Sequence, residues 1–151
     1  HKRVELGYIS MKSAVEEERI IVPHTLVCTP MRWHVRAYCE KHRDYRDFVL
    51  SRFRGIPEII DNSEHTVEQD ELWNTFINIQ IKPDGRLGEM QQDIIARDFD
   101  MTDGCLTVKT RAPLVEYMLR AFNIDPRKLE MVPEAQQIVV ANYKEIEPFL
   151  F

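Results

Sequence analysis

The sequence of 151 residues predicts a mixed fold, in which a small β-domain is followed by an α+β domain. Several short strand-like runs crowd into residues 1–57, a density typical of a small β-barrel or a half-open sandwich. From residue 75 onward, strand-like and helix-like runs alternate in the order βαβαβ, which is typical of a ferredoxin-like α+β domain. We therefore expect a barrel at 1–57, a linker at 58–74 and an α+β domain at 75–151.

Four runs predict the strands of the first domain. Val4–Met11 alternates in polarity, and Arg19–Val27 is rich in Ile and Val. Pro23 interrupts the second run, so we expect an edge position or a strand start there, because proline cannot donate to a ladder. Met31–Glu40 and Tyr45–Phe53 then alternate on either side of a connection of usual hairpin length.

Alternation divides the first hairpin strand into two faces. Val35, Ala37 and Cys39 share the face of Trp33, which we expect to be a core anchor rather than a base-stacking platform. The opposite face carries Arg32, His34, Arg36 and Tyr38. A face rich in Arg and His beside an aromatic ring is typical of an anion or nucleic-acid reader. An ordinary solvated face, with Arg chosen for solubility, is an equal alternative.

The second hairpin strand adds two further cations. Arg46 and Arg52 lie on the same face as Phe48 and Leu50, which we expect in the barrel core. The acidic stretch Glu58–Trp73 follows, and we expect it to be a solvated connector with a short helical turn.

The second domain is predicted from spacing and turn residues. Its expected strands are Thr75–Ile81, Cys105–Thr110 and Gln136–Ala141, and its expected helices are Gly88–Ala96 and Leu114–Phe122. Pro133 could open a helix instead, and Tyr143–Phe151 is a further helix candidate. The apolar helix and the apolar tail exceed what so small a unit easily hides, so we expect a homodimer.

Composition and charge narrow the class of protein. No apolar run approaches the roughly 20 residues of a membrane span, and no signal peptide is visible, so we expect a cytoplasmic protein without a membrane partner. The three cysteines lack CxxC spacing and read as small hydrophobes. Residues 1–60 carry 11 Lys and Arg against 8 Asp and Glu, whereas 61–151 carry 9 against 17. Only the first part is therefore expected to meet an anion.

The sequence contains no nucleotide-binding, metalloprotease or serine-hydrolase motif. A metal site could combine His24 and His34 with Cys28 or Cys39, but the surrounding arginines would repel a cation. We therefore expect no enzyme activity, no cofactor and no metal.

The hairpin and the segment before it also resemble a known family. The matching blocks, in order, are Pro23-His24, Arg32-Trp33-His34-Val35-Arg36-Ala37-Tyr38 and Tyr45-Arg46-Asp47-Phe48-Val49-Leu50-Ser51-Arg52. They are similar to the WYL-domain bacterial transcriptional regulators, especially to a branch of repressors that control phage-defence gene islands. The Trp-Tyr-Leu triplet that names the family is Trp33-His34-Val35 here, so only its tryptophan is kept. The segment order in 75–151 resembles the accessory domain that follows the barrel in these regulators and often mediates dimerisation.

The resemblance implies an Sm-like, SH3-type barrel that senses a nucleotide or oligonucleotide effector. It also implies an upstream winged helix-turn-helix that binds operator DNA, and because the first residue is His1, we expect the chain to be part of a longer protein. The residues expected to bind the effector are Ser10, His24, Arg32, His34, Arg36, Tyr38, Arg46 and Arg52. Arginine forks would bond phosphate oxygens in pairs.

His34 stands where the family has a tyrosine, and its ring can carry charge near neutral pH. Effector binding through His34 would therefore tighten as the pH falls. The main alternative function is an Sm-like RNA-binding module without a promoter role, and a small nucleotide-processing enzyme is a third.

Overall fold

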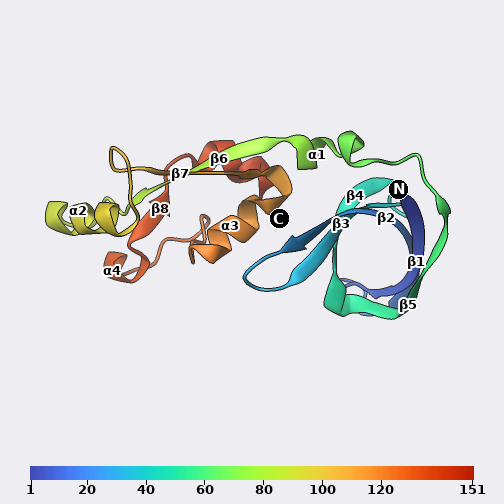
Figure 1. Cartoon of the computed structure of the whole chain (residues 1–151). Helices are drawn as coiled ribbons and strands as arrows, with labels where there is room; N and C mark the ends of the chain where they lie inside the picture. The colour runs from blue at the N-terminus through green and yellow to red at the C-terminus, as the bar shows by residue number, and fades with distance from the viewer. The chain divides into compact units, whose positions relative to one another are not determined.

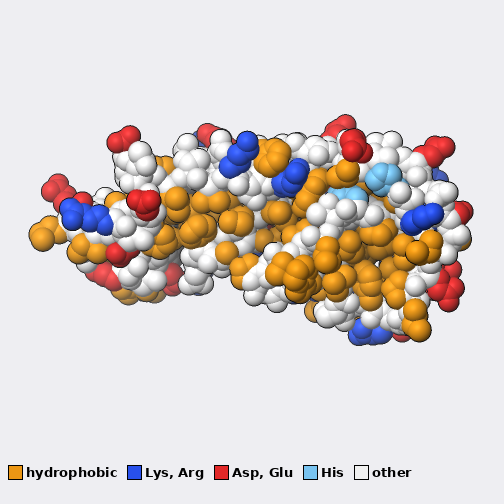
Figure 2. Space-filling model, viewed as in Figure 1, with side chains coloured by type: hydrophobic (Ala, Val, Ile, Leu, Met, Phe, Trp, Pro, Cys, Tyr) orange, Lys and Arg blue, Asp and Glu red, His pale blue; other side chains and the backbone are white.

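The computed structural model describes residues 1–151 and divides them into two compact units, His1–Glu71 and Leu72–Phe151. Each unit contains one antiparallel sheet (Figure 1). The molecule is therefore a sheet-rich α+β protein, as the sequence predicts. The face drawn in Figure 2 exposes many apolar side chains, with acidic and basic groups mostly near its outline.

The first unit is a five-stranded sheet in the order β4-β3-β2-β1-β5. Its strands are β1 (Lys2–Ile9), β2 (Glu16–Cys28), β3 (Trp33–Cys39), β4 (Asp44–Val49) and β5 (Phe53–Asn62), and a short 3-10 turn, η1 (Leu50–Arg52), joins the last two. The ribbon curls strongly (Figure 1), yet β4 and β5 remain the two edges and do not pair. The closed barrel that we expected is therefore not found.

The inner side of this curl holds a small core. It is formed by Leu6, Tyr8, Ile21, Ala37, Cys39 and Phe48, with Val35 packed against it. The expected core face of β3 is thus confirmed for Val35, Ala37 and Cys39. Trp33 was wrongly placed in the core, because it is the first residue of β3 and stays 51% exposed at the end of the strand.

Two strands differ from the prediction, because each of them contains a proline and continues past it. Pro23 lies inside β2, a central strand, where the register with β3 shifts between Pro23 and Thr25. A bulge of this kind removes the need for a ladder donor. The fifth strand, β5, runs through Pro57 to Asn62. It shows no alternation because its residues are almost all exposed, as an edge strand allows.

The connector between the sheets is partly helical. It contains a 3-10 turn, η2 (Val67–Gln69), and one turn of helix, α1 (Glu71–Asn74), close to the predicted helical turn. The expectation that this acidic stretch is solvated is wrong for Asp70, which is only 1% exposed. Leu50, expected in the first core, is instead partly exposed in η1.

The second unit has a three-stranded sheet in the order β7-β6-β8. Its elements are β6 (Phe76–Pro83), α2 (Glu89–Asp98), β7 (Leu106–Arg111), η3 (Ala112–Leu114), α3 (Val115–Ala121), α4 (Pro133–Gln136), β8 (Ile138–Val140), α5 (Tyr143–Ile146) and η4 (Glu147–Phe149). All the strands and helices predicted in 75–141 are present, and Pro133 does open a helix before the last strand. A ferredoxin-like arrangement of these elements stays a prediction.

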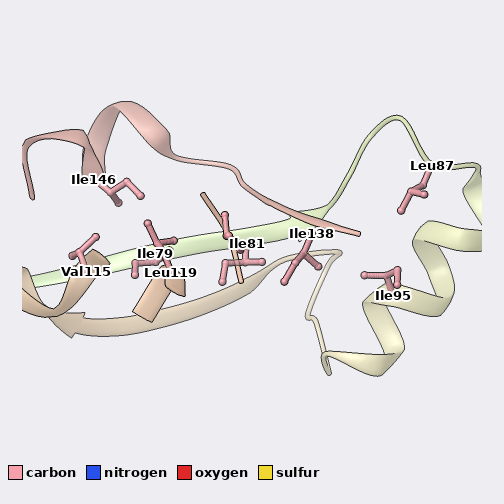
Figure 3. Close-up of a cluster of buried hydrophobic side chains, with 9 residues drawn as sticks. Ile79, Ile81, Leu87, Ile95, Val115, Leu119, Ile138 and Ile146 are labelled. Atoms are coloured by element: carbon pink, nitrogen blue, oxygen red, sulfur yellow. The ribbon is translucent and has the colours of Figure 1, made fainter. Parts of the chain in front are cut away.

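The core of the second unit is aliphatic (Figure 3). It contains Ile79, Ile81, Leu87, Ile95, Val115, Leu119, Ile124, Ile138 and Ile146. Phe149 and Leu150 pack against this cluster. The apolar helix and tail on which we based the expected homodimer are therefore used mainly inside the unit. No helix of the structure is long and apolar enough to cross a membrane.

Candidate functional site

A pocket of about 240 Å³ lies within the first unit and shares two residues with its core. Residues from two turns, three strands and η1 line it: Tyr8, Ser10, Met11, Lys12, Arg19, His42, Arg46, Asp47, Phe48 and Arg52. Tyr8 and Phe48 also belong to the hydrophobic core, and their rings meet edge to face at 5.1 Å. The pocket therefore combines an apolar part with a concentration of cations.

The cations of the pocket differ in how far they are already neutralised. Arg19 is buried and forms an ion pair with Glu17. Arg46 only approaches Asp44 at 3.9 Å. None of the salt bridges in residues 1–151 involves Lys12 or Arg52, both of which line the pocket. The pocket can therefore offer positive charge to an anion that enters it.

Local turn chemistry positions the polar groups at the pocket. The turn between β1 and β2 is closed by a hydrogen bond from the Ala14 amide to the Ser10 carbonyl at 2.9 Å. The Ser10 hydroxyl accepts from the Ser13 amide at 3.1 Å and lies 2.8 Å from the Ser13 hydroxyl. The hydroxyl of Tyr8, which also lines the pocket, accepts a hydrogen bond from the buried Val49 amide at 3.2 Å.

His42 is the histidine that lines the pocket. Local desolvation, and then the nearby positive charges of Arg46 and Arg19, lower the pKa of His42, although the residue is exposed. The ring is therefore biased towards its neutral form while no anion is present. A phosphate in the pocket would act in the opposite direction and favour the imidazolium.

A buried charge cluster lies beside the pocket and shares one residue with it. The Arg36 guanidinium donates to both Asp70 oxygens, from Nε at 2.7 Å and from a terminal nitrogen at 3.0 Å. Its other terminal nitrogen donates to Asp47 Oδ1 at 3.3 Å. Asp47 also lines the pocket. Two carboxylates therefore neutralise Arg36, which is 5% exposed.

Two histidines complete this charge cluster. His24 Nε2 lies 3.2 Å from Asp70 Oδ2, and His34 Nε2 lies 3.8 Å from Asp47 Oδ2. Burial lowers the pKa of both histidines, and the neighbouring carboxylates only partly offset it. Burial likewise raises the pKa of Asp47. These groups hold one another in the fold and are not arranged to meet an anion from solvent.

Aromatic residues of β3 and β4 pack against the connector and form hydrogen bonds with it. Tyr38 stacks on His65 with ring centroids 3.5 Å apart, and it meets Tyr45 edge to face at 5.3 Å. The Tyr45 hydroxyl donates to the Thr66 carbonyl at 2.7 Å. Together with Asp70, these contacts make the connector a strap across β3 and β4, so we call residues 63–70 the strap.

The structure thus divides the residues expected to bind the effector. It brings Ser10, Arg46 and Arg52 together at the pocket. It places His24, His34, Arg36 and Tyr38 in the charge cluster and under the strap instead. Arg32 lies outside both sets and has a buried Nε without a hydrogen-bond acceptor.

Sequence reasoning did not include Lys12, Arg19 and His42 in the expected site. They reach the pocket from a turn, from β2 and from the hairpin connection, so no single strand pattern contains them. Asp47 was not included either, and it accepts a hydrogen bond from Arg36 while it lines the pocket. No group of three or more His, Cys, Asp or Glu side chains in residues 1–151 is placed to hold a metal ion.

Comparison with known proteins identifies both units. Residues 1–57 match the WYL domain, and residues 76–146 match the family described as the BrxR transcriptional regulator, C-terminal dimerization domain. The chain is 33% identical over 147 residues to the DNA-binding transcriptional repressor CapW of Pseudomonas aeruginosa, covering 97% of this chain and 49% of that protein. It is 35% identical over 150 residues to CapW of Escherichia coli strain KTE188, covering 99% of this chain and 50% of that protein.

The chain therefore spans about half the length of the curated relatives it matches. A solved structure of the proteasome accessory factor B/C of Arthrobacter aurescens aligns with a TM-score of 0.42 and 18% identity, covering 98% of this chain and 24% of that one. The two matched domains occur here in the order in which the sequence resemblance places them. The chain belongs to the WYL-domain family of bacterial transcriptional regulators, with a WYL domain followed by a BrxR-type C-terminal dimerization domain.

Proposed function

We propose that this chain is the effector-sensing and dimerising portion of a transcriptional repressor. The proposed effector is a nucleotide or a single-stranded nucleic acid that places a phosphate in the pocket of the first unit. The observation that carries this proposal is the pocket itself, where Lys12 and Arg52 have no salt-bridge partner and Arg46 has only a distant one. Arginine binds phosphate oxygens in pairs, and lysine binds them as a point charge.

The size of the pocket favours one phosphate-bearing unit over a long strand. Its volume of about 240 Å³ is below the range of roughly 300–1,000 Å³ usual for drug-sized ligands. A terminal nucleotide could enter while the rest of a longer ligand stays outside. An Sm-like module that binds RNA along its surface would instead use an open basic groove.

Operator binding is proposed for a winged helix-turn-helix upstream of His1. The curated relatives are named DNA-binding repressors and are about twice as long as this chain. Effector binding would then change operator affinity by favouring one of two arrangements of the dimer. No catalytic role is proposed, because the pocket offers cations to bind an anion and no nucleophile paired with a base.

Titration of the chain with adenosine monophosphate and with a short oligothymidine at several salt concentrations tests this function. We expect affinity to fall with salt, with a logarithmic slope of about 0.7 for each phosphate neutralised on a single strand. Arg46→Ala and Arg52→Ala should weaken binding and flatten the slope. Lys144→Ala, at an exposed lysine of the second unit, is the matched control and should change neither. Binding that ignores salt and both pocket variants would exclude the pocket as a phosphate site.

A further inference from the structure

The second unit exposes apolar side chains at the end where α2 and α4 lie. Met90 and Ile94 on α2 are 82% and 55% exposed. Leu129, Met131 and Val132, in the segment before α4, are 61%, 94% and 56% exposed. We call these five residues the α2–α4 surface. Figure 2 shows apolar side chains at this end of the second unit beside acidic and basic ones.

Hydrogen bonds of Arg86 fix the segment before α4 against the turn before α2. The Arg86 guanidinium donates two hydrogen bonds to the buried Asp84 carboxylate, from Nε at 3.0 Å and from a terminal nitrogen at 2.6 Å. Its other terminal nitrogen donates to the Glu130 carbonyl at 2.7 Å. The Glu130 amide in turn donates to Gln136 Oε1 at 2.7 Å. The segment that carries Met131 is therefore fastened to the turn before α2.

A hollow lies between the two halves of the surface. It has a volume of about 190 Å³, and its lining residues are Leu87, Gln91, Ile94, Ile95, Glu134 and Gln137. A hollow beside protruding methionines is suited to self-association, since Met side chains adapt to irregular gaps.

We propose that the α2–α4 surface is the contact that joins two copies of this chain. The inference rests on the proposed dimer and adds the surface that forms it. The family matched by residues 76–146 is described as a dimerization domain, and the α2–α4 surface lies wholly inside that range. A two-fold contact uses the same patch on both copies, so a methionine of one copy can enter the hollow of the other.

The mixed charges around the α2–α4 surface favour a second copy of this chain, rather than nucleic acid, as its binding partner. Asp93 and Arg97 pair at 2.9 Å on α2, and Lys128, Glu130 and Glu134 follow on the other side. A patch with both signs around an apolar centre can complement its own copy. Nucleic acid would require an excess of positive charge, which this patch lacks.

The rest of the second unit offers a less suitable contact. The outward side chains of β6 and β7 include Asn78, Gln80 and Thr107, which are polar. Phe76, on β6, is 51% exposed, but two cations lie over its ring, Lys109 at 4.8 Å and Arg111 at 4.6 Å from the centroid. The α2–α4 surface therefore contains five of the eight exposed large apolar side chains of this unit, and Leu72, Phe76 and Phe151 are the other three.

Sedimentation equilibrium of the full chain and of Met90→Asp/Met131→Asp tests the inference. Both methionines are highly exposed, so the substitutions should leave the fold intact, which thermal unfolding will check. We expect the dimer dissociation constant to rise roughly tenfold for each single variant and about a hundredfold for the double variant, as for interface residues that cost over 1 kcal/mol each. Met31→Asp, at a methionine of the first unit that is 56% exposed and does not line the pocket, is the matched control and should not alter it.

Each outcome decides a separate claim. A wild-type chain that is monomeric at tens of micromolar overturns the dimer itself. A wild-type dimer whose dissociation constant is unchanged in the double variant leaves the dimer standing and removes the α2–α4 surface as its contact. Hydrogen exchange of the unmodified chain gives an independent readout. Residues 87–95 and 128–135 should be more protected in the dimer than after dilution, and equal protection contradicts the inference.

Discussion

Replacing Arg36 by methionine should strongly destabilise the first unit. The substitution keeps much of the side-chain length and removes the charge that faces Asp70 and Asp47. Arg36 makes two hydrogen bonds to Asp70, at 2.7 and 3.0 Å, and one to Asp47 at 3.3 Å. Asp70 is 1% exposed, so its carboxylate would be left buried without its cation.

The expected loss follows from the cost of an uncompensated buried charge. Breaking a buried ion pair by removing one partner costs about 3–5 kcal/mol. For a domain of 60–100 residues, each kcal/mol lowers the melting temperature by about 4–8 °C, so a decrease of at least about 12 °C is expected. Urea unfolding followed by circular dichroism, with thermal scans beside it, measures both quantities.

A double-mutant cycle separates the ion pair from general packing. Asp70→Asn should itself be destabilising, but less so in the Arg36→Met background, which gives a favourable coupling energy between the two positions. Arg46→Met, at a half-exposed arginine 3.9 Å from Asp44, is the matched control and should cost no more than about 0.5 kcal/mol. A loss below about 1 kcal/mol for Arg36→Met, or no coupling to Asp70, would refute this account of the cluster.

Three further outcomes follow from the same contacts. Burial lowers the pKa of His24 and His34. The unfolded chain therefore binds protons more readily than the folded chain. The free energy of unfolding should keep its full value above the unfolded pKa of about 6.5 and fall as the pH drops below it. Urea unfolding between pH 8 and 5 checks this, and His24→Gln/His34→Gln should flatten the slope. His42, whose pKa local desolvation and cations lower, should take up a proton when phosphate binds, so adenosine monophosphate should bind more tightly at pH 6 than at pH 7.5, and His42→Gln should remove that difference. Tyr8→Phe should cost about 1–3 kcal/mol in urea unfolding, because the buried Val49 amide loses its acceptor, and an unchanged midpoint would contradict that role.

Local patterns predicted most of the elements because alternation and helical spacing report burial directly. Ala37 and Cys39 lie in the core as predicted, and Ile79 and Ile81 share the inner face of β6. The pattern failed where a strand is exposed on both faces, as in β5. Such a strand has no buried face to impose a period of two on its sequence.

The candidate site was only partly predictable, because the sequence does not show which carboxylate forms an ion pair with which arginine. Arg36 and Arg52 look alike in the sequence, yet Arg36 is held by two buried carboxylates and Arg52 lines the pocket. The decisive partner, Asp70, lies 34 positions from Arg36 in an acidic stretch that composition alone assigns to solvent. The pH response that we expected of His34 is better assigned to His42, the histidine that lines the pocket.

The free edge formed by β5 has a consequence for how the chain avoids aggregation. An exposed edge strand with Ile56, Ile59 and Ile60 is a template on which another chain could add a strand. Pro57 interrupts that template, because it has no amide hydrogen to offer. The register with β1 also slips beside it, between Glu5 and Gly7. A missing donor and a shifted register should together make this edge a poor template for strand addition, so the chain can leave a whole strand open to water at a lower risk of edge-to-edge pairing.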